Sequence, residues 1–123
     1  MIQILAVAAG GALGSVCRYG IGVLTAGLGF PWGTMIVNVV GSFIMGLLVA
    51  FFTQNAEISQ TTRLFLTVGI LGGFTTFSAF SLDSVLLLQK GQTLAAVFYI
   101  VASVILSLAA LAGGMMLIRM MPA

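Results

Sequence analysis

This sequence has very little charge and few of the side chains on which enzymes depend. Only six of its 123 residues are charged, histidine is absent, and Glu57 and Asp83 are the only carboxylate side chains. Such a set leaves almost nothing for a transition-metal site, a carboxylate pair or a catalytic triad. The single cysteine, Cys17, cannot form an internal disulfide, and a net charge of +2 is too small to indicate a nucleic-acid partner. We therefore expect neither an enzyme nor a nucleic-acid-binding protein.

What the sequence does contain is long hydrophobic runs. Hydrophobic residues make up 61% of the chain and charged residues 5%, whereas roughly a quarter of a soluble domain is charged. Four runs are long enough for helices that cross a bilayer, which need about 20 apolar residues each. They cover residues 2–24, 32–52, 64–88 and 94–118. The sequence predicts an all-α membrane protein with one four-helix transmembrane domain over residues 1–123.

A β-barrel and a cleaved secretory signal fit these hydrophobic runs less well. The strands of a membrane β-barrel would alternate apolar and polar residues, and these runs are continuous. A secretory signal would begin with basic residues, and the first run has none before Arg18. We therefore expect the first run to be a retained membrane helix.

The basic residues give no clear orientation in the membrane. At about 1.5 Å per residue, Arg18 is expected near the far end of the first helix, on the same side as Lys90. Arg63 and Arg119 are then expected on the other side, a balance of two against two. Orientation is set by Lys and Arg in short loops, so a balanced chain can insert both ways, unless four charges are simply too few to decide. Two opposite orientations would permit an antiparallel homodimer.

Small residues are spaced so that helices can approach closely. The pattern of two small residues four positions apart indicates tight helix packing without identifying the partner helix. It occurs at Gly10 and Gly14, Ser42 and Gly46, Gly69 and Gly73, and Ala109 and Gly113.

One face of the second run is polar. Thr34, Asn38, Gly41 and Ser42 recur at helical spacing. Polar side chains within a membrane are costly and tend to face the protein interior or a water-filled path. A hydrogen bond from Asn38 to another helix is the simpler interpretation, and a place in an ion path is the alternative.

The fourth run carries three hydroxyl groups in one stripe. Tyr99, Ser103 and Ser107 are spaced by four residues, which brings them to nearly the same helix face. They could form a polar track for an ion. Alternatively, each serine could bond to the carbonyl four residues before it.

The third run contains features that interrupt helices. Gly72-Gly73 are followed by Thr75, Thr76 and Ser78, residue types that cap a new helix. This point lies about 11 residues into the run, ~17 Å along a helix and near half of a ~30 Å hydrocarbon core. We expect a break near the membrane midplane that frees backbone groups for ions, with a harmless glycine kink as the alternative.

Two phenylalanines follow the expected break. The positive ring edges of Phe77 and Phe80 could approach an anion weakly. Ordinary packing within a membrane helix accounts for the same residues, and their spacing does not decide between the two.

Three stretches of this chain resemble the Fluc/CrcB family of fluoride channels. The stretch GGFTTFSAFS in the third run is the most specific, and WGTMIVNVVGS and GALGSVCRYG also match. Length, hydrophobic runs and short loops agree across nearly the whole chain. The resemblance implies a passive channel of the bacterial inner membrane that exports fluoride and excludes chloride. It also implies an antiparallel, dual-topology homodimer with two pores.

The resemblance also implies which residues act. The backbone carbonyls of Gly72 and Thr75 would hold a structural Na⁺ at the dimer interface, and Arg18 lies in a stretch that matches the family. Asp83 would close the polar track. The expected fluoride-pore residues are Asn38, Phe77, Phe80, Thr34, Ser78, Tyr99, Ser103, Ser107 and Asp83.

Two rival functions differ in what they require. A small multidrug exporter needs a carboxylate buried in a membrane helix for proton coupling, and here the only one in a hydrophobic run is Asp83, late in the third. A non-transporting membrane subunit would give no ion flux as a purified protein.

Overall fold

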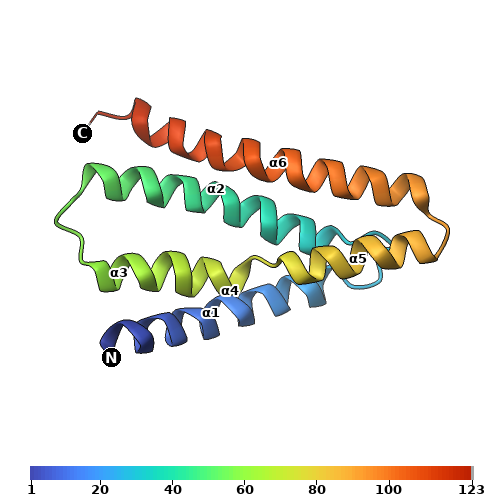
Figure 1. Ribbon diagram of the computed structural model, residues 1–123, viewed down its shortest axis with the longest axis horizontal. Helices are drawn as coiled ribbons and strands as arrows, with labels where there is room; N and C mark the ends of the chain where they lie inside the picture. Colours follow the sequence, from blue (N-terminus) through green and yellow to red (C-terminus); the bar gives the residue numbers. More distant parts are fainter. Residues whose placement is uncertain (123) are drawn as a thin grey trace.

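The computed structural model describes residues 1–122, and these are almost entirely helical (Figure 1). Four helical spans are long and apolar enough to cross a membrane, which confirms the prediction of an all-helical chain with four such spans. The first, second and fourth spans are α1 (Ile2–Thr25), α2 (Trp32–Gln54) and α6 (Thr93–Met120). The third is built from α3 (Gln60–Leu64), the π-helix η1 (Phe65–Leu71), α4 (Gly72–Phe74) and α5 (Phe77–Gln89).

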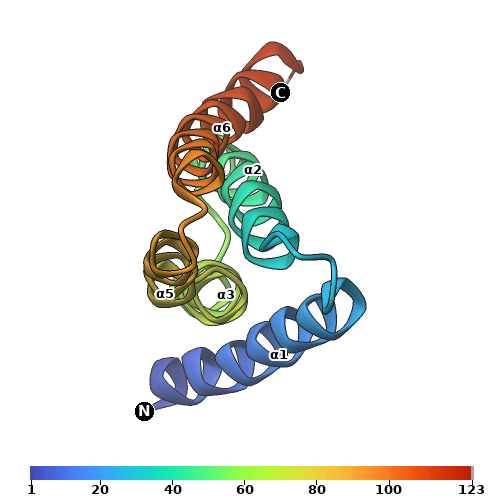
Figure 2. The ribbon, with the colours of Figure 1, turned by 90° about the vertical axis from the view of Figure 1, so that its right-hand side faces the viewer.

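The four spans run back and forth between two ends of the molecule. The two termini lie at the same end as the α2–α3 connection, and the α1–α2 and α5–α6 connections lie at the other end (Figure 1). Viewed from one end, α6 and α2 lie side by side, the third span lies next to them, and α1 lies farthest from α6 (Figure 2). The main packing partners are therefore α2 with α6 and α1 with η1 and α4.

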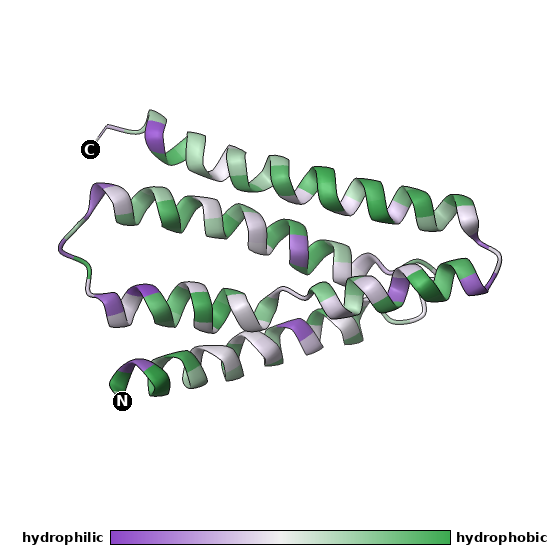
Figure 3. Cartoon of the chain, in the orientation of Figure 1, coloured by the Kyte–Doolittle hydropathy of each residue, from purple (hydrophilic) through white to green (hydrophobic). Residues whose placement is uncertain are grey.

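Large apolar side chains are exposed on the outside of the spans, and hydrophobic residues predominate along all four spans (Figure 3). Ile4, Val16, Ile105 and Leu108 are each more than half exposed. The buried core is small by comparison and centres on Met35, Leu87, Ala96 and Tyr99. Such a surface requires an apolar solvent, as expected for a protein whose helices face lipid.

Glycines allow the α1 contact with the third span. A Cβ atom on Gly10 would lie 2.9 Å from the Cα of Gly69, and one on Gly14 would collide with the backbone of Ile70. The pairs predicted at Gly10 and Gly14 and at Gly69 and Gly73 therefore face each other, and backbone meets backbone.

The second close contact joins α2 and α6. A Cβ on Gly46 would collide with the carbonyl of Leu111, and one on Gly114 would collide with the carbonyl of Phe43. Gly113, which the small-residue pattern indicated, has nothing within 4 Å of such a Cβ. The contact is thus one residue further along α6 than expected.

The third span loses its helical conformation at two residues, between α4 and α5. Thr75 (φ −88°, ψ 158°) and Thr76 (φ −153°, ψ 118°) are extended. The sequence had placed the interruption at Gly72-Gly73, but both glycines are helical. Gly73 serves close packing instead, because a Cβ there would lie 2.5 Å from the carbonyl oxygen of Gly11.

Candidate functional site

Asn38 holds the interruption from α2. Its side-chain Oδ1 accepts a hydrogen bond from the N–H of Thr76 (2.8 Å), and its Nδ2 donates to the Thr76 carbonyl (3.0 Å). The backbone N–H and C=O of Thr76 are thus both bonded to the side-chain amide of Asn38. The helix–helix hydrogen bond considered for Asn38 therefore exists. A primary amide has two N–H groups, so one donor of Nδ2 remains beyond the bond to Thr76.

Arg18 holds the interruption from α1. Its Nε donates to the carbonyl of Gly73 at 2.9 Å, and the side chain is half-buried. The sequence predicts Arg18 near the far end of a helix over residues 2–24; α1 ends close to that point, at Thr25, but Arg18 lies seven residues, about 10 Å, before the end. The guanidinium therefore lies beside the interruption of the third span and not at the helix end.

Thr75, Thr76 and Ser78 were all predicted as capping residues, but only Thr76 caps the helix that follows the interruption. The hydroxyl of Thr76 accepts from the N–H of Ala79 and caps α5. The N–H and the hydroxyl of Thr75 both donate to the carbonyl of Leu71, which closes the preceding helix. Ser78 is exposed, with its hydroxyl 3.2 Å from that of Thr76.

These side chains replace the bonds of a continuous helix. The N–H of Thr76 would reach the Gly72 carbonyl in an α-helix, and it donates to Asn38 instead. The N–H of Ala79 would reach the Thr75 carbonyl, and it donates to the Thr76 hydroxyl. Gly72 and Thr75 thus lose their α-helical partners, and their oxygens could bind a cation.

A cavity of about 280 Å³ adjoins the interruption. It lies between α2, α6 and the start of α5, and the hydroxyl of Ser103 beside it is buried without a hydrogen-bond partner among residues 1–122. Its lining consists of Asn38, Ser42, Thr75, Thr76, Phe77, Phe80, Ser103, Val104, Ser107 and Leu108. The structure therefore gathers five of the predicted pore residues around one polar-edged space: Asn38, Phe77, Phe80, Ser103 and Ser107.

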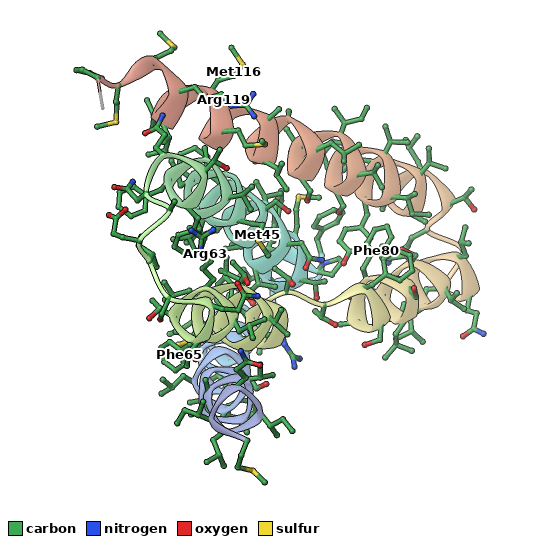
Figure 4. All side chains as sticks on the ribbon, turned by 60° about the vertical axis from the view of Figure 1, so that its left-hand side comes forward. Met45, Arg63, Phe65, Phe80, Met116 and Arg119 are labelled. Atoms are coloured by element: carbon green, nitrogen blue, oxygen red, sulfur yellow. The ribbon has the colours of Figure 1, made fainter. Side chains whose placement is uncertain are left out.

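The two phenylalanines at this cavity differ in their surroundings. Their ring centroids are 5.6 Å apart, and Phe77 is 78% exposed. Phe80 packs on Tyr99 at 5.4 Å between centroids and lies on the side of α5 that faces α6 (Figure 4). Packing within one chain accounts for Phe80 but not for Phe77.

The remaining predicted pore residues lie outside this cavity. Tyr99 is fully buried, and its hydroxyl donates to Oδ2 of Asp83 at 3.0 Å, which links α6 to α5. Asp83 lines a second cavity of about 270 Å³ together with Lys90. Thr34 lines a third, of about 410 Å³, with Arg18 and Thr76. The three hydroxyls of the α6 stripe thus do not share one space.

Arg63 has a structural role that the sequence interpretation missed. It donates to the carbonyls of Phe52 (3.0 Å), Asn55 (3.1 Å) and Ile58 (3.1 Å), at the end of α2 and in the connection to α3 (Figure 4). Its guanidinium also lies 5.1 Å from the centroid of the Phe52 ring. Arg63 lies 11 residues after Phe52 in the chain and just before the predicted third run, so no sequence signal connects it with the end of α2.

Four membrane-spanning helices with a polar cavity beside an interrupted span define a multi-pass helical membrane protein. A family model described as "CrcB-like protein, Camphor Resistance (CrcB)" matches residues 5–115. The chain therefore belongs to the CrcB family.

Curated relatives match over nearly their whole length. The "Fluoride-specific ion channel FluC" of Rhizobium meliloti (strain 1021) is 53% identical over 124 residues, covering 98% of this chain and 99% of the relative. The protein of the same name from Agrobacterium fabrum is 52% identical, covering 97% and 98%. The "Fluoride-specific ion channel FluC 1" of Nitrobacter hamburgensis is 49% identical, covering 96% of each chain.

Proposed function

We propose that this protein is a passive, fluoride-specific channel of the bacterial inner membrane that exports fluoride from the cytoplasm. The names of its relatives support this function, and the match extends over nearly the whole chain. The structural observation that supports it most is the buried hydroxyl of Ser103, which lies in the same cavity as Asn38 and has no hydrogen-bond partner within residues 1–122. A buried donor without a hydrogen-bond partner is rare in proteins, and a small anion in the cavity would supply the missing acceptor.

The groups around the cavity suit a weakly held anion. The second N–H of Asn38 and the hydroxyls of Ser103 and Ser107 can donate hydrogen bonds. The first amide groups of α5 carry the positive end of a helix dipole. The ring edges of Phe77 and Phe80 add weak positive potential. Fluoride holds its water tightly, so several such donors are needed to replace it, and each must be weak enough for the ion to leave.

The other predicted residues would extend the path. Tyr99 contacts Phe80 on one side and Asp83 through its hydroxyl. We place Thr34 and Ser78 beside the interruption and Asp83 at the outlet toward Lys90. The hydrogen bond that Tyr99 donates to Asp83 reduces the repulsion that this carboxylate exerts on a passing anion.

A single chain is half of the proposed channel. We propose an antiparallel homodimer with two pores, in which a second copy covers surfaces such as the exposed ring of Phe77. With Arg18 inside the span, the charges at the two ends are Lys90 against Arg63 and Arg119. This difference of one charge is still too small to impose an orientation strongly, so the chain remains suited to dual topology.

The proposed dimer would hold a structural Na⁺. Each copy offers the carbonyls of Gly72 and Thr75, neutral oxygens without α-helical partners, which are ligands that unwound membrane helices use for Na⁺. We place this interruption near the membrane midplane. When bound, the ion supplies a fixed positive charge in a region of low dielectric constant, where its field extends further than in water.

Fluoride efflux from vesicles tests the function. The purified protein is reconstituted into liposomes loaded with potassium fluoride, and efflux is followed with a fluoride electrode while a potassium ionophore removes the voltage. We expect rapid fluoride release and no chloride release from matched vesicles. Equal release of both ions would contradict a fluoride-specific channel, and no release would favour a non-transporting subunit.

Two further arms use the same preparation. Efflux of an organic cation driven by a proton gradient would favour a small exporter over a channel. Replacing Na⁺ by N-methylglucamine throughout purification is expected to reduce the fraction of dimer in detergent. A dimer fraction that does not depend on Na⁺ would reject the sodium site and leave the channel proposal intact.

A further inference from the structure

Arg18 takes the place of a missing backbone donor. In a continuous helix the Gly73 carbonyl would accept the N–H of Phe77, but the extended Thr75 and Thr76 separate these groups. The Nε of Arg18 donates to that carbonyl at 2.9 Å. A charged donor makes a stronger hydrogen bond than a neutral one, so Gly73 is the most firmly held carbonyl of the interruption.

The packing of α1 fixes where Arg18 reaches. Gly10 and Gly14 press the backbone of α1 against η1, where even one added carbon would collide. A Cβ on Gly73 would lie 3.0 Å from the backbone nitrogen of Ser15, one turn before Arg18. Since α1 cannot slide along this contact, the reach of Arg18 is set by the register of two close-packed backbones.

Arg18 also limits which oxygens are left for an ion. The carbonyls of Gly72, Gly73, Phe74 and Thr75 each lose an α-helical partner at the interruption, and Arg18 occupies that of Gly73. We propose that Arg18 is a positioning residue whose Nε–H fixes the interruption by holding the Gly73 carbonyl, so that the carbonyls of Gly72 and Thr75 are among those left uncovered. The consequence for Na⁺ rests on the proposed function, whereas the holding of the interruption does not.

A matched pair of variants separates the donor from the charge. The Nε2 atom of glutamine is the same number of bonds from Cα as the Nε of arginine, so Arg18→Gln keeps a donor in place and removes the charge. Arg18→Met has a neutral side chain of similar length without a donor. Because both variants are neutral, any difference between them reports the hydrogen bond to Gly73.

The test is amide hydrogen exchange of the purified proteins in lipid nanodiscs. We expect exchange of residues 74–79 to be about tenfold faster in Arg18→Met than in the wild type, and near the wild-type rate in Arg18→Gln. Residues 100–115 of α6, the helix farthest from α1 (Figure 2), serve as the internal control. Equal exchange of residues 74–79 in the two variants would overturn the proposal, because charge or bulk would then explain Arg18.

Misfolding of a variant also gives an answer. If Arg18→Met fails to fold and Arg18→Gln folds, the donor is required, as proposed. If both fail, a donor at the right place is not sufficient and the proposal is wrong. This exchange experiment uses neither fluoride nor Na⁺, so a wild-type protein that releases no fluoride would refute the channel without affecting the role of Arg18.

A second readout addresses the sodium ligands. The Na⁺ concentration at half-maximal dimer stability is expected to rise about tenfold in Arg18→Met and to stay near the wild-type value in Arg18→Gln. Parallel shifts in both variants would indicate that the charge of Arg18, and not its hydrogen bond, affects the ion.

Discussion

At the scale of single residues, the polar side chains of the third span and its surroundings are mostly occupied with the backbone. Asn38 bonds both polar groups of Thr76, Arg18 bonds Gly73, and Thr75 bonds Leu71. Ser103 is the exception, with a buried hydroxyl that has no partner in the described part of the chain. The same residues thus shape an interrupted helix and border a cavity, and a substitution can affect either role.

Asn38→Asp distinguishes the two roles of Asn38. The carboxylate can still accept from the Thr76 N–H, but it loses the donor to the Thr76 carbonyl and adds a negative charge beside the cavity. A unit charge ~4 Å from an anion costs about 4 kcal/mol at an effective dielectric constant of 20. We therefore expect fluoride efflux to fall by at least about a hundredfold, measured with the electrode assay.

Asn55→Asp is the matched control, because it makes the same chemical change in the α2–α3 connection, beside Arg63. Its efflux should equal that of the wild type. Normal efflux through Asn38→Asp would show that the ion does not pass this side chain.

At the scale of elements, hydropathy predicted the spans well because each run is continuous. The second span begins at Trp32 as expected, and the first ends at Thr25, one residue later than expected. The third begins earlier, at Gln60, because Ser59 caps a polar helical turn that hydropathy does not detect. The site residues near Asn38 were predictable from helical spacing, since Gly41 and Asn38 both face Thr75 and Thr76.

The partners of the small residues were less predictable. Helices turn by about 100° per residue, so the step from Gly113 to Gly114 changes which face of α6 meets α2, and the sequence pattern allowed either. Likewise, a Gly-Gly pair such as Gly72-Gly73 can either interrupt a helix or allow another helix to approach closely. The position of α1 beside Gly73, which the sequence does not reveal, determines that the second applies here. The hydrogen bonds of Arg18 and Arg63 depend on this three-dimensional packing and left no sequence signal of comparable strength.

Gly10→Ala tests the contact between α1 and the third span. The added carbon would lie 2.5 Å from the Phe65 carbonyl oxygen and 2.9 Å from the Cα of Gly69, so a backbone must shift. Overpacking of this kind typically costs about 1–3 kcal/mol. We expect a corresponding loss of stability in reversible unfolding by SDS, followed by circular dichroism.

Gly11→Ala is the control on the neighbouring residue, where the added carbon would meet only the Gly69 carbonyl, at 4.0 Å. Its stability should lie within about 0.5 kcal/mol of the wild type. If the two variants are equally stable, the close approach of α1 to η1 does not exist in the membrane.

At the scale of the whole molecule, the few basic residues lie at the two ends and at one point between them. Lys90 follows α5 at one end, whereas Arg63 and Arg119 lie at the other, with the termini (Figures 1 and 4). Arg18 lies inside the span and contributes less to orientation than a loop charge does. A protein so nearly balanced should respond to a single added charge.

Labelling of a cysteine in the α5–α6 connection measures this response. In a Cys17→Ser background, Gln92→Cys in inner-membrane vesicles should react in part with a membrane-impermeant maleimide, and completely after detergent is added. Adding Gln89→Lys should retain this end in the cytoplasm, whereas Gln60→Lys should retain the opposite end, so the two changes should shift the labelled fraction in opposite directions. A labelled fraction that is all or none in each of the three proteins would mean that the chain has one fixed orientation. An antiparallel homodimer could then not form, and a fluoride channel built from this chain would need a different partner.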